Sequence, residues 1–153
     1  MLLGVCSDPF AIRSFPRPLP FDFIEGHVQN FLLPEAPEAE FAPHDAALAG
    51  AGVPMPAANC LFPADLKVVG PAVDLVRFDR YVESAFRRAQ RCGLRLVVFG
   101  SAGARMVPEG FPKTRAFEQY VEALKRMAPV AQRHGITLVV EPLNRGECNL
   151  INT

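Results

Sequence analysis

Five short apolar segments are spaced along the chain, and each has the length and composition of a β-strand. The later ones, such as LRLVVF and ITLVV, are nearly continuous runs of aliphatic residues, which is typical of parallel strands that are covered on both faces. The pattern predicts strands over Leu2–Ser7, Phe21–Val28, Pro56–Phe62, Leu94–Gly100 and Ile136–Leu143.

Two longer segments between the later strands repeat apolar residues every three or four positions, which is the period of one helical face. The first runs over Phe78–Ala89, and Gly93 follows it as a C-terminal stop. The second runs over Phe117–Ala131, with Thr114 as the predicted N-cap and Gly135 as the stop. The sequence therefore predicts two long amphipathic helices in the second half of the chain.

Two stretches do not fit a simple alternation of strands and helices. Residues 8–20 contain four prolines, which is too many for a normal crossover helix. An extended chain of that length can still span roughly 40 Å, so it can return along the sheet without a helix. Residues 34–52 are rich in proline and alanine and leave room for only a short helix, around His44–Ala51.

The order strand–helix–strand–helix–strand predicts a parallel sheet covered by helices, because parallel strands need crossover connections, and these are right-handed. A doubly wound sheet and a partial barrel both satisfy this order. Neither long helix is preceded by a glycine-rich phosphate loop, which counts against a dinucleotide-binding fold. Because no internal repeat or linker divides the chain, residues 1–153 are predicted to form a single domain.

The composition is that of an ordinary globular protein: half of the 153 residues are hydrophobic, and 16 basic residues balance 16 acidic ones. This balance, without a basic stripe, argues against a nucleic-acid partner.

No apolar run approaches the roughly eighteen residues of a membrane span, and the start lacks the features of a signal peptide. The four cysteines form no C-x-x-C pair, which favours reduced thiols in a cytoplasmic protein. Cys6 and Cys60, near strand ends, are predicted to be small core residues rather than nucleophiles.

The end of the last apolar strand carries the most informative polar residue of the chain. Glu141 follows Val140 directly and is followed by Pro142, which stops the strand ladder. By the period of two along a strand, Thr137, Val139 and Glu141 face the same way. In a barrel that face is the interior, and the active site lies at the C-terminal rim. A glutamate there is costly unless it pairs with a basic residue or binds a metal ion, and both alternatives stay open at this point.

At these residues the sequence resembles a known family. The segments ITLVVEPLNRGECNLINT at the C-terminal end and VVFGSAGARMVPEGF after the fourth strand are similar to motifs of the sugar phosphate isomerase/epimerase family, the xylose-isomerase-like barrels. The resemblance covers residues 59–153 and is weak before Asn59. It implies an α/β fold, a partial (β/α)8 TIM barrel with about five parallel strands and outer helices.

The resemblance also implies a function. Enzymes of this family move a proton on the carbon next to the carbonyl of a small-molecule sugar or sugar phosphate. Glu141 matches the glutamate that binds a divalent metal ion and acts as the catalytic acid/base, and Glu147 matches one that hydrogen-bonds a substrate hydroxyl. The ion would be Mn²⁺, Mg²⁺, Co²⁺ or Zn²⁺. Its remaining ligands, an Asp, a His and a second Glu, are expected beyond Thr153, so the 153-residue chain by itself is expected to be inactive.

Other polar residues near strand ends are candidates for the substrate site. Glu25 and His27 share one face at the end of the second strand, where they would line a sugar pocket or else form a satisfied polar pair. Ser101 and Arg105 lie in the loop after the fourth strand, which would cover the substrate. There Arg105 would meet a phosphate or hydroxyls, or simply lie in solvent. Asn144 lies within the family motif after the last strand and is a further candidate for substrate binding.

Two alternatives to a sugar isomerase remain. The apurinic-endonuclease branch shares this barrel and cuts DNA with zinc, but it would need histidines at the ends of strands three and four, where this chain has Asn59-Cys60 and Gly100-Ser101. The other alternative is a non-catalytic half-barrel, either a fragment or a subunit that another chain completes. The open first and last strands of a half-barrel would favour self-association.

Overall fold

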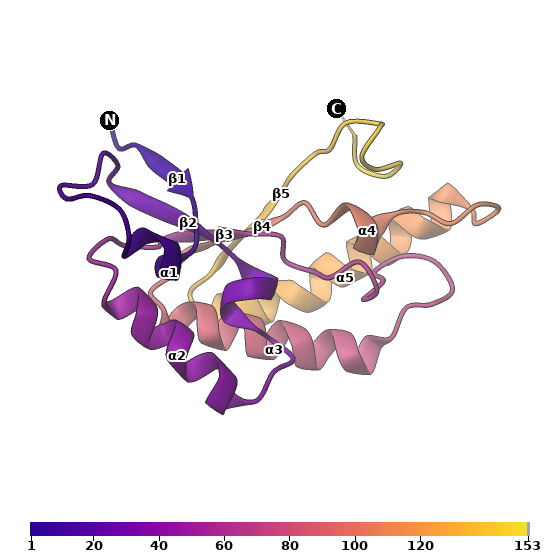
Figure 1. The fold of residues 1–153 in the computed structure, drawn as a ribbon. Helices are drawn as coiled ribbons and strands as arrows, with labels where there is room; N and C mark the ends of the chain where they lie inside the picture. The colour runs from indigo at the N-terminus through magenta and orange to yellow at the C-terminus, as the bar shows by residue number, and fades with distance from the viewer. Residues whose placement is uncertain (153) are drawn as a thin grey trace.

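Five parallel strands form one sheet, in the order in which they occur along the chain (Figure 1). The computed structural model describes residues 1–152. A doubly wound sheet reverses its strand order at a switch point, whereas a barrel winds steadily in one direction. The fold is therefore α/β, a partial TIM barrel, as predicted. The strands are β1 (Gly4–Cys6), β2 (Phe23–His27), β3 (Ala57–Asn59), β4 (Leu96–Phe99) and β5 (Thr137–Val140).

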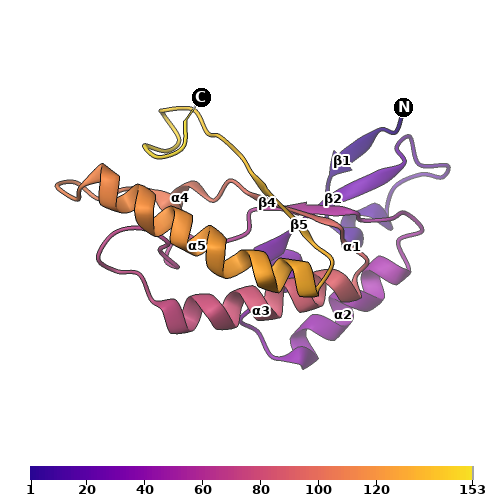
Figure 2. The ribbon, with the colours of Figure 1, turned by 180° about the vertical axis from the view of Figure 1, so that it is seen from behind.

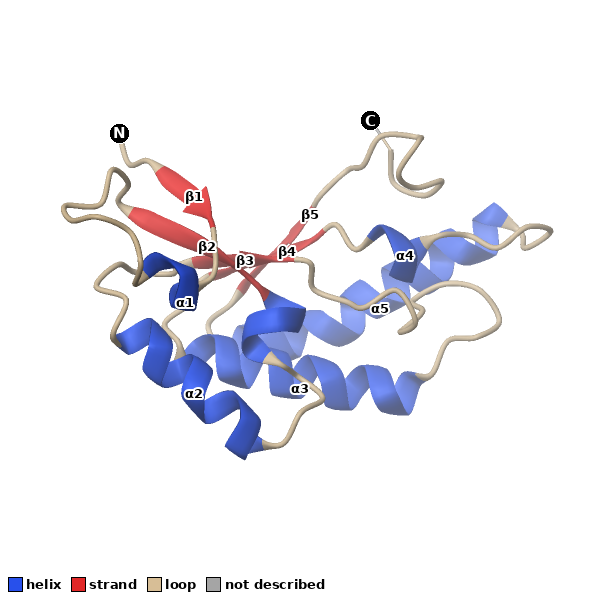
Figure 3. Cartoon of the chain, in the orientation of Figure 1, coloured by secondary structure: helices blue, strands red, loops and turns tan. Residues whose placement is uncertain are grey.

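Three long helices lie on the same side of the sheet and leave the other side open (Figures 1, 2 and 3). They are α2 (Glu38–Ala49), α3 (Leu75–Arg91) and α5 (Lys113–Arg133). Three short turns complete the structure: α1 (Pro9–Ile12), the π-helical turn η1 (Val28–Leu32) and α4 (Ala102–Arg105). In the part of the chain that the structure describes, no helix is long and apolar enough to cross a membrane.

The core lies between the sheet and the helices. Alternate strand residues point into it, so Ile24 and Val97 are fully buried while the residues beside them in the strands are only partly covered. Phe62 occupies the centre of an aromatic cluster in this layer. Its ring centre lies 5.3, 5.4 and 5.1 Å from those of Phe78, Tyr81 and Phe99. One face of the sheet is thus covered by the core, and a ligand that binds the sheet itself has to use the other.

The predicted elements exist, but several of their ends differ. Every strand is shorter than predicted, and the third ends early because Cys60 has a φ of +53°, outside the β region. The two long helices stop where predicted: Gly93 and Gly135 follow them with φ of +78° and +65°. Thr114 is not the N-cap of α5, because the helix begins at Lys113. Its N-cap is Pro112, which makes no side-chain hydrogen bond.

The first half of the chain contains more helix than predicted. α2 has 12 residues and begins at Glu38 rather than near His44, because Pro43 lies inside the helix without ending it. The Pro43 ring is exposed, so the main cost is one missing backbone hydrogen bond, and burial of Phe41 on the opposite side offsets it. Residues 8–20 contain only the single turn α1, in line with the prediction.

A buried arginine ties α3 to the loop that follows β2. Arg88 is only 2% exposed, and its guanidinium carbon lies 4.7 Å from the centre of the Phe41 ring. Its Nε and Nη2 donate hydrogen bonds to Glu38 Oε1 at 3.0 and 2.8 Å. Its Nη1 and Nη2 also donate to the carbonyl oxygens of Leu32, Leu33 and Ala36. We refer to Arg88 with these partners as the Arg88 clamp.

We expect the protein to lose stability in acid, because the Arg88 clamp depends on the Glu38 carboxylate. Hydrogen bonds from Arg87 and Arg88 lower the pKa of the Glu38 carboxyl from 4.5 to about 2. A carboxyl whose pKa falls on folding contributes stability that is complete above its unfolded pKa and is lost as the pH falls through the folded value. In urea titrations, the wild type should therefore be more stable than Glu38→Gln at pH 6, and the difference should shrink between pH 4.5 and 2. A difference that stays constant over this range would contradict a role for the Glu38 carboxylate.

Candidate functional site on the open face of the sheet

Glu141 lies directly after β5, on the side of the sheet that the helices leave open. β4 and β5 pair Val98 with Val139, so the next residues on that face are Gly100 and Glu141. The carboxylate folds over Gly100: a Cβ on that glycine would collide with Glu141 Oε2. The prediction that Glu141 faces the rim of the sheet rather than the helical layer is confirmed.

A second polar group occupies the same face on β1, β2 and β3. The Cys6 thiol donates a hydrogen bond to Glu25 Oε2 over 3.3 Å, and Asn59 Nδ2 donates to Cys6 Sγ over 3.8 Å. His27 is in register with Asn59, and its Nδ1 accepts a hydrogen bond from the backbone N–H of Asn30 at 3.3 Å. Burial lowers the pKa of the His27 imidazole, so the ring is neutral near pH 7 and carries its proton on Nε2. Glu25 and His27 thus share one polar surface, as their spacing predicted.

Cys60 connects this group electrostatically with Glu141. Burial is the main cause of the raised pKa of the Cys60 thiol, and the negative charges of Glu141 and Glu25 raise it further. Burial and the hydrogen bond to Glu25 likewise raise the pKa of the Cys6 thiol. Both thiols are therefore protonated near pH 7, which makes them hydrogen-bond donors rather than nucleophiles. The prediction of a core position is wrong for Cys6, which is exposed, because the strand alternation directs it to the open face.

The segment after β4 is tied to the ends of both neighbouring strands. Ser101 Oγ accepts a hydrogen bond from the backbone N–H of Phe62 at 2.9 Å, which holds the chain after β3. Arg105 Nη2 donates to the carbonyl oxygen of Glu141 at 2.7 Å. We expected Arg105 in an open loop, but it is fully buried between the end of β5 and Tyr120, because the turn α4 directs it into the protein. This position separates the guanidinium from the surface where a substrate would bind.

The loop after β5 carries two further predicted residues, and they pair with each other. Glu147 Oε2 accepts hydrogen bonds from the Asn144 side-chain and backbone nitrogens, at 2.6 and 3.3 Å. Asn144 Oδ1 accepts from the backbone N–H of Gly146 at 2.9 Å. Both side chains are exposed. The hydrogen bonds of both side chains therefore stay within the turn, and neither side chain is bonded to Glu141.

The described residues do not form a complete metal site. Within residues 1–152, no three His, Cys, Asp or Glu side chains converge as ligands. Glu141 and Glu25 offer the oxygen atoms that hard divalent ions prefer. The strands that position them are separated by β3 and β4, so the two carboxylates alone do not enclose an ion.

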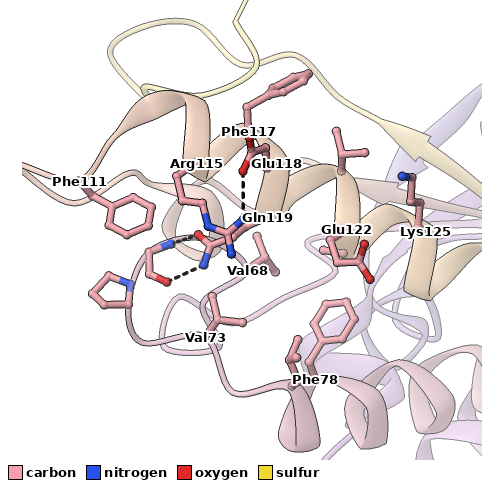
Figure 4. A pocket seen from close by; sticks show the side chains of 15 residues that line it. Val68, Val73, Phe78, Phe111, Arg115, Phe117, Glu118, Gln119, Glu122 and Lys125 are labelled. Atoms are coloured by element: carbon pink, nitrogen blue, oxygen red, sulfur yellow. Dashed lines mark hydrogen bonds and ion pairs between the residues drawn. The ribbon is translucent and has the colours of Figure 1, made fainter.

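A large cavity lies in the helical layer instead. A groove of about 920 Å³ runs between α5 and the chain that leads into α3 (Figure 4). The Gln119 side chain spans its floor, pairing with both the N–H and the C=O of Gly70, at 2.7 and 3.0 Å. Its apolar wall includes Val68, Val73, Phe78 and Phe117. Volume would favour this groove, but active sites of barrels form at the C-terminal ends of the strands, which favours the open face.

Comparisons with solved structures identify proteins of the same fold. The chain superimposes on D-psicose 3-epimerase from Clostridium cellulolyticum H10 with a TM-score of 0.77 and 20% identity, over 99% of this chain and 56% of the other. For L-ribulose 3-epimerase the TM-score is 0.71 and the identity 21%, over 99% of this chain and 53% of the other. For 3-keto-D-glucoside 4-epimerase from E. coli the TM-score is 0.69 and the identity 18%, over 99% of this chain and 60% of the other. At these identities the likeness shows the fold, and the chain spans little more than half the length of these structures.

The sequence comparisons place the chain in a family. No match was found among curated proteins. A family model described as a xylose isomerase-like TIM barrel matches residues 19–153. That match covers most of the chain, and it agrees with the uninterrupted order of five parallel strands. The chain therefore belongs to the xylose isomerase-like TIM barrel family.

Proposed function

We propose that this chain carries part of the active site of a sugar isomerase or epimerase, with Glu141 as its acid/base. The observation that supports this most directly is the position of Glu141, after the C-terminal end of a barrel strand, on the open face and folded over Gly100. The similar structures include epimerases of D-psicose and L-ribulose, which makes a ketose the substrate class that we propose.

The proposed reaction exchanges a proton on the carbon next to the ketose carbonyl. The Glu141 carboxylate would take this proton and return one to the same carbon or its neighbour. Negative charge then develops on the carbonyl oxygen and needs stabilisation by a donor or cation. Across the sheet, Glu25 would accept hydrogen bonds from sugar hydroxyls, while His27 Nε2 and Asn59 Nδ2 would donate them.

A neutral ketose fits this surface better than a sugar phosphate. None of the five strands contains a lysine or arginine, and the open face carries the two carboxylates Glu25 and Glu141. A phosphate dianion would face these negative charges without a partner cation. Arg105, which we considered as a phosphate ligand, is buried and bound to a carbonyl oxygen.

A divalent ion, Mn²⁺, Mg²⁺, Co²⁺ or Zn²⁺, belongs to the proposal with Glu141 as one ligand. When bound, such an ion polarises a carbonyl and stabilises an enediolate. Since no three donors converge within residues 1–152, its other ligands would come from elsewhere, and we derive no step through it. Ser101, Asn144 and Glu147 would border the sugar from the loops after β4 and β5.

An NMR titration of the ¹⁵N-labelled chain tests the site. D-fructose, the sugar in one of the similar structures, should shift the amide signals of Gly26, Gly100 and Glu141. Glu141→Gln should weaken this binding about tenfold, because a charged acceptor is lost. D-fructose 6-phosphate should bind more weakly than D-fructose. Because the metal ligands are incomplete, the same samples should show no conversion of the sugar.

A matched control separates this site from the groove in the helical layer. Glu122→Gln makes the same change on α5, where the side chain lines the groove, and should leave D-fructose binding unchanged. Shifts centred on Gly70 and Phe117 instead of the strand ends would place the sugar in the groove and contradict the proposal. Conversion that a chelator abolishes would show that residues 1–153 hold a complete metal site.

A further inference from the structure

Arg105 is a fully buried arginine with few partners. Its side chain is 0% exposed, and its Nη2 donates a hydrogen bond to the carbonyl oxygen of Glu141. Its Nε and Nη1 have no partner there. The guanidinium carbon lies 6.0 Å from the centre of the Tyr120 ring. The Tyr120 hydroxyl is buried as well, and burial raises its pKa although its polar interaction with the Arg105 side chain and the charge of that guanidinium oppose the rise.

Such a residue is costly to the folded state. Removing a guanidinium from water is unfavourable unless its donors are satisfied and its charge is paired. The Arg88 clamp meets this requirement, because every nitrogen of that guanidinium has a partner. Arg105 is equally buried and leaves two of its three nitrogens unpartnered. The hydrogen bonds of Arg105 therefore offset less of its burial cost than those of Arg88 do, and a role in a functional site is one explanation for such a group.

The contacts of Arg105 converge on Glu141. The backbone N–H of Glu141 donates to the carbonyl oxygen of Phe99 at 3.3 Å, and its own carbonyl oxygen accepts from Arg105. Its carboxylate occupies the space that Gly100 leaves free. Glu141 is thus held at its amide and its carbonyl, and both contacts come from β4 or the segment that follows it. Pro142 then prevents the ladder from continuing.

We propose that Arg105 is a positioning residue for Glu141, retained at the expense of stability. By fixing the carbonyl oxygen of Glu141, it sets the direction in which the carboxylate leaves the end of β5. The inference rests on the proposed function in that Glu141 is the acid/base of the site. It also differs from the role of a substrate ligand, because Arg105 acts through the backbone of Glu141 from inside the protein.

Two measurements on the 153-residue chain test this together. Methionine has a volume similar to that of arginine and no charge. In Arg105→Met the carbonyl oxygen of Glu141 loses its charged donor, so the residue is held only weakly at the end of β5. The exchange rate of the Glu141 amide hydrogen, which is bonded to Phe99, should then rise roughly tenfold or more. The amide of Thr137, at the other end of β5, should not change, because it donates to Arg95 at 2.7 Å. The melting temperature of Arg105→Met should be no lower than that of the wild type.

Two further variants complete the design. Arg105→Lys keeps a charged donor and should restore much of the protection of the Glu141 amide. Arg115→Met removes the same charge from an exposed side chain, which forms an ion pair with Glu118, and should change neither measurement. A lower melting temperature or failure to fold in Arg105→Met would show that Arg105 is a stabilising residue. An unchanged exchange rate of the Glu141 amide would show that Arg105 does not position Glu141. Either result overturns the proposal. Neither measurement depends on sugar binding, so a failure of the proposed function would be recognised separately.

Discussion

Arg88→Met should lower the free energy of unfolding by about 1 to 3 kcal/mol for each buried carbonyl oxygen that loses its donor. The side chain would leave the Leu32 and Ala36 carbonyl oxygens without their donor, and Leu32 is fully buried. Unpaired buried acceptors carry their full desolvation cost. Urea unfolding followed by circular dichroism measures the change, and hydrogen exchange should show that the loop after β2 opens first.

The neighbouring arginine provides the control. Arg87 pairs with the same carboxylate of Glu38, at 2.6 Å, but its side chain is 47% exposed. Arg87→Met removes a solvent-exposed ion pair and should cost less than about 1 kcal/mol. If both variants lost the same stability, burial and the carbonyl contacts of Arg88 would not be the source of the effect.

The 153-residue chain should associate through the edges of its sheet. Within residues 1–152, β1 and β5 are the outer strands of the sheet and each pairs with one neighbour. An outer strand presents unpaired backbone groups, and Val5 and Val140 beside them are 38% and 37% exposed. Apolar edge strands pair readily with a second copy. In sedimentation experiments at micromolar concentration, the wild type should form dimers or larger species, and Val140→Lys should weaken the association at least about tenfold, because a charge on an edge strand opposes pairing.

A second lysine substitution distinguishes the edge from the helical layer. Val76, in the first turn of α3, is 67% exposed and follows Leu75, which lines the groove. Val76→Lys should leave the association unchanged. If it disrupts the dimer as strongly as Val140→Lys does, the copies meet through the helices. A wild-type chain that sediments as a single monomer with a cooperative melt would show that the edges are not available for pairing.

The comparison of α2 with α3 shows why some elements were predictable and others were not. α3 has an uninterrupted apolar stripe and a glycine stop, so local periodicity describes it fully. In α2 the proline at position 43 argues locally against a helix. Tertiary contacts reverse that preference, because Phe41 is buried beneath the guanidinium groups of Arg88 and Arg91.

The candidate site also contains residues whose position the sequence predicted and one whose position it did not. The alternation of a strand predicted the face of Glu141 and the shared face of Glu25 and His27. Nothing in the sequence around Arg105 distinguishes it from an exposed loop arginine, and only its position against Glu141 and Tyr120 shows otherwise.

The sequence by itself determined the strands, the two long helices and which side chains share a strand face, because periodicity and glycine stops act over a few neighbouring residues. Tertiary structure alone decided the contacts between distant residues. Arg105 and Glu141 are 36 residues apart, Cys6 and Glu25 are 19 apart, and Arg88 and Leu32 are 56 apart. The first two pairs meet because parallel strands in register bring their C-terminal ends and the following loops together, and the third because α3 packs against the segment that follows β2. A one-dimensional pattern contains neither the register nor this packing.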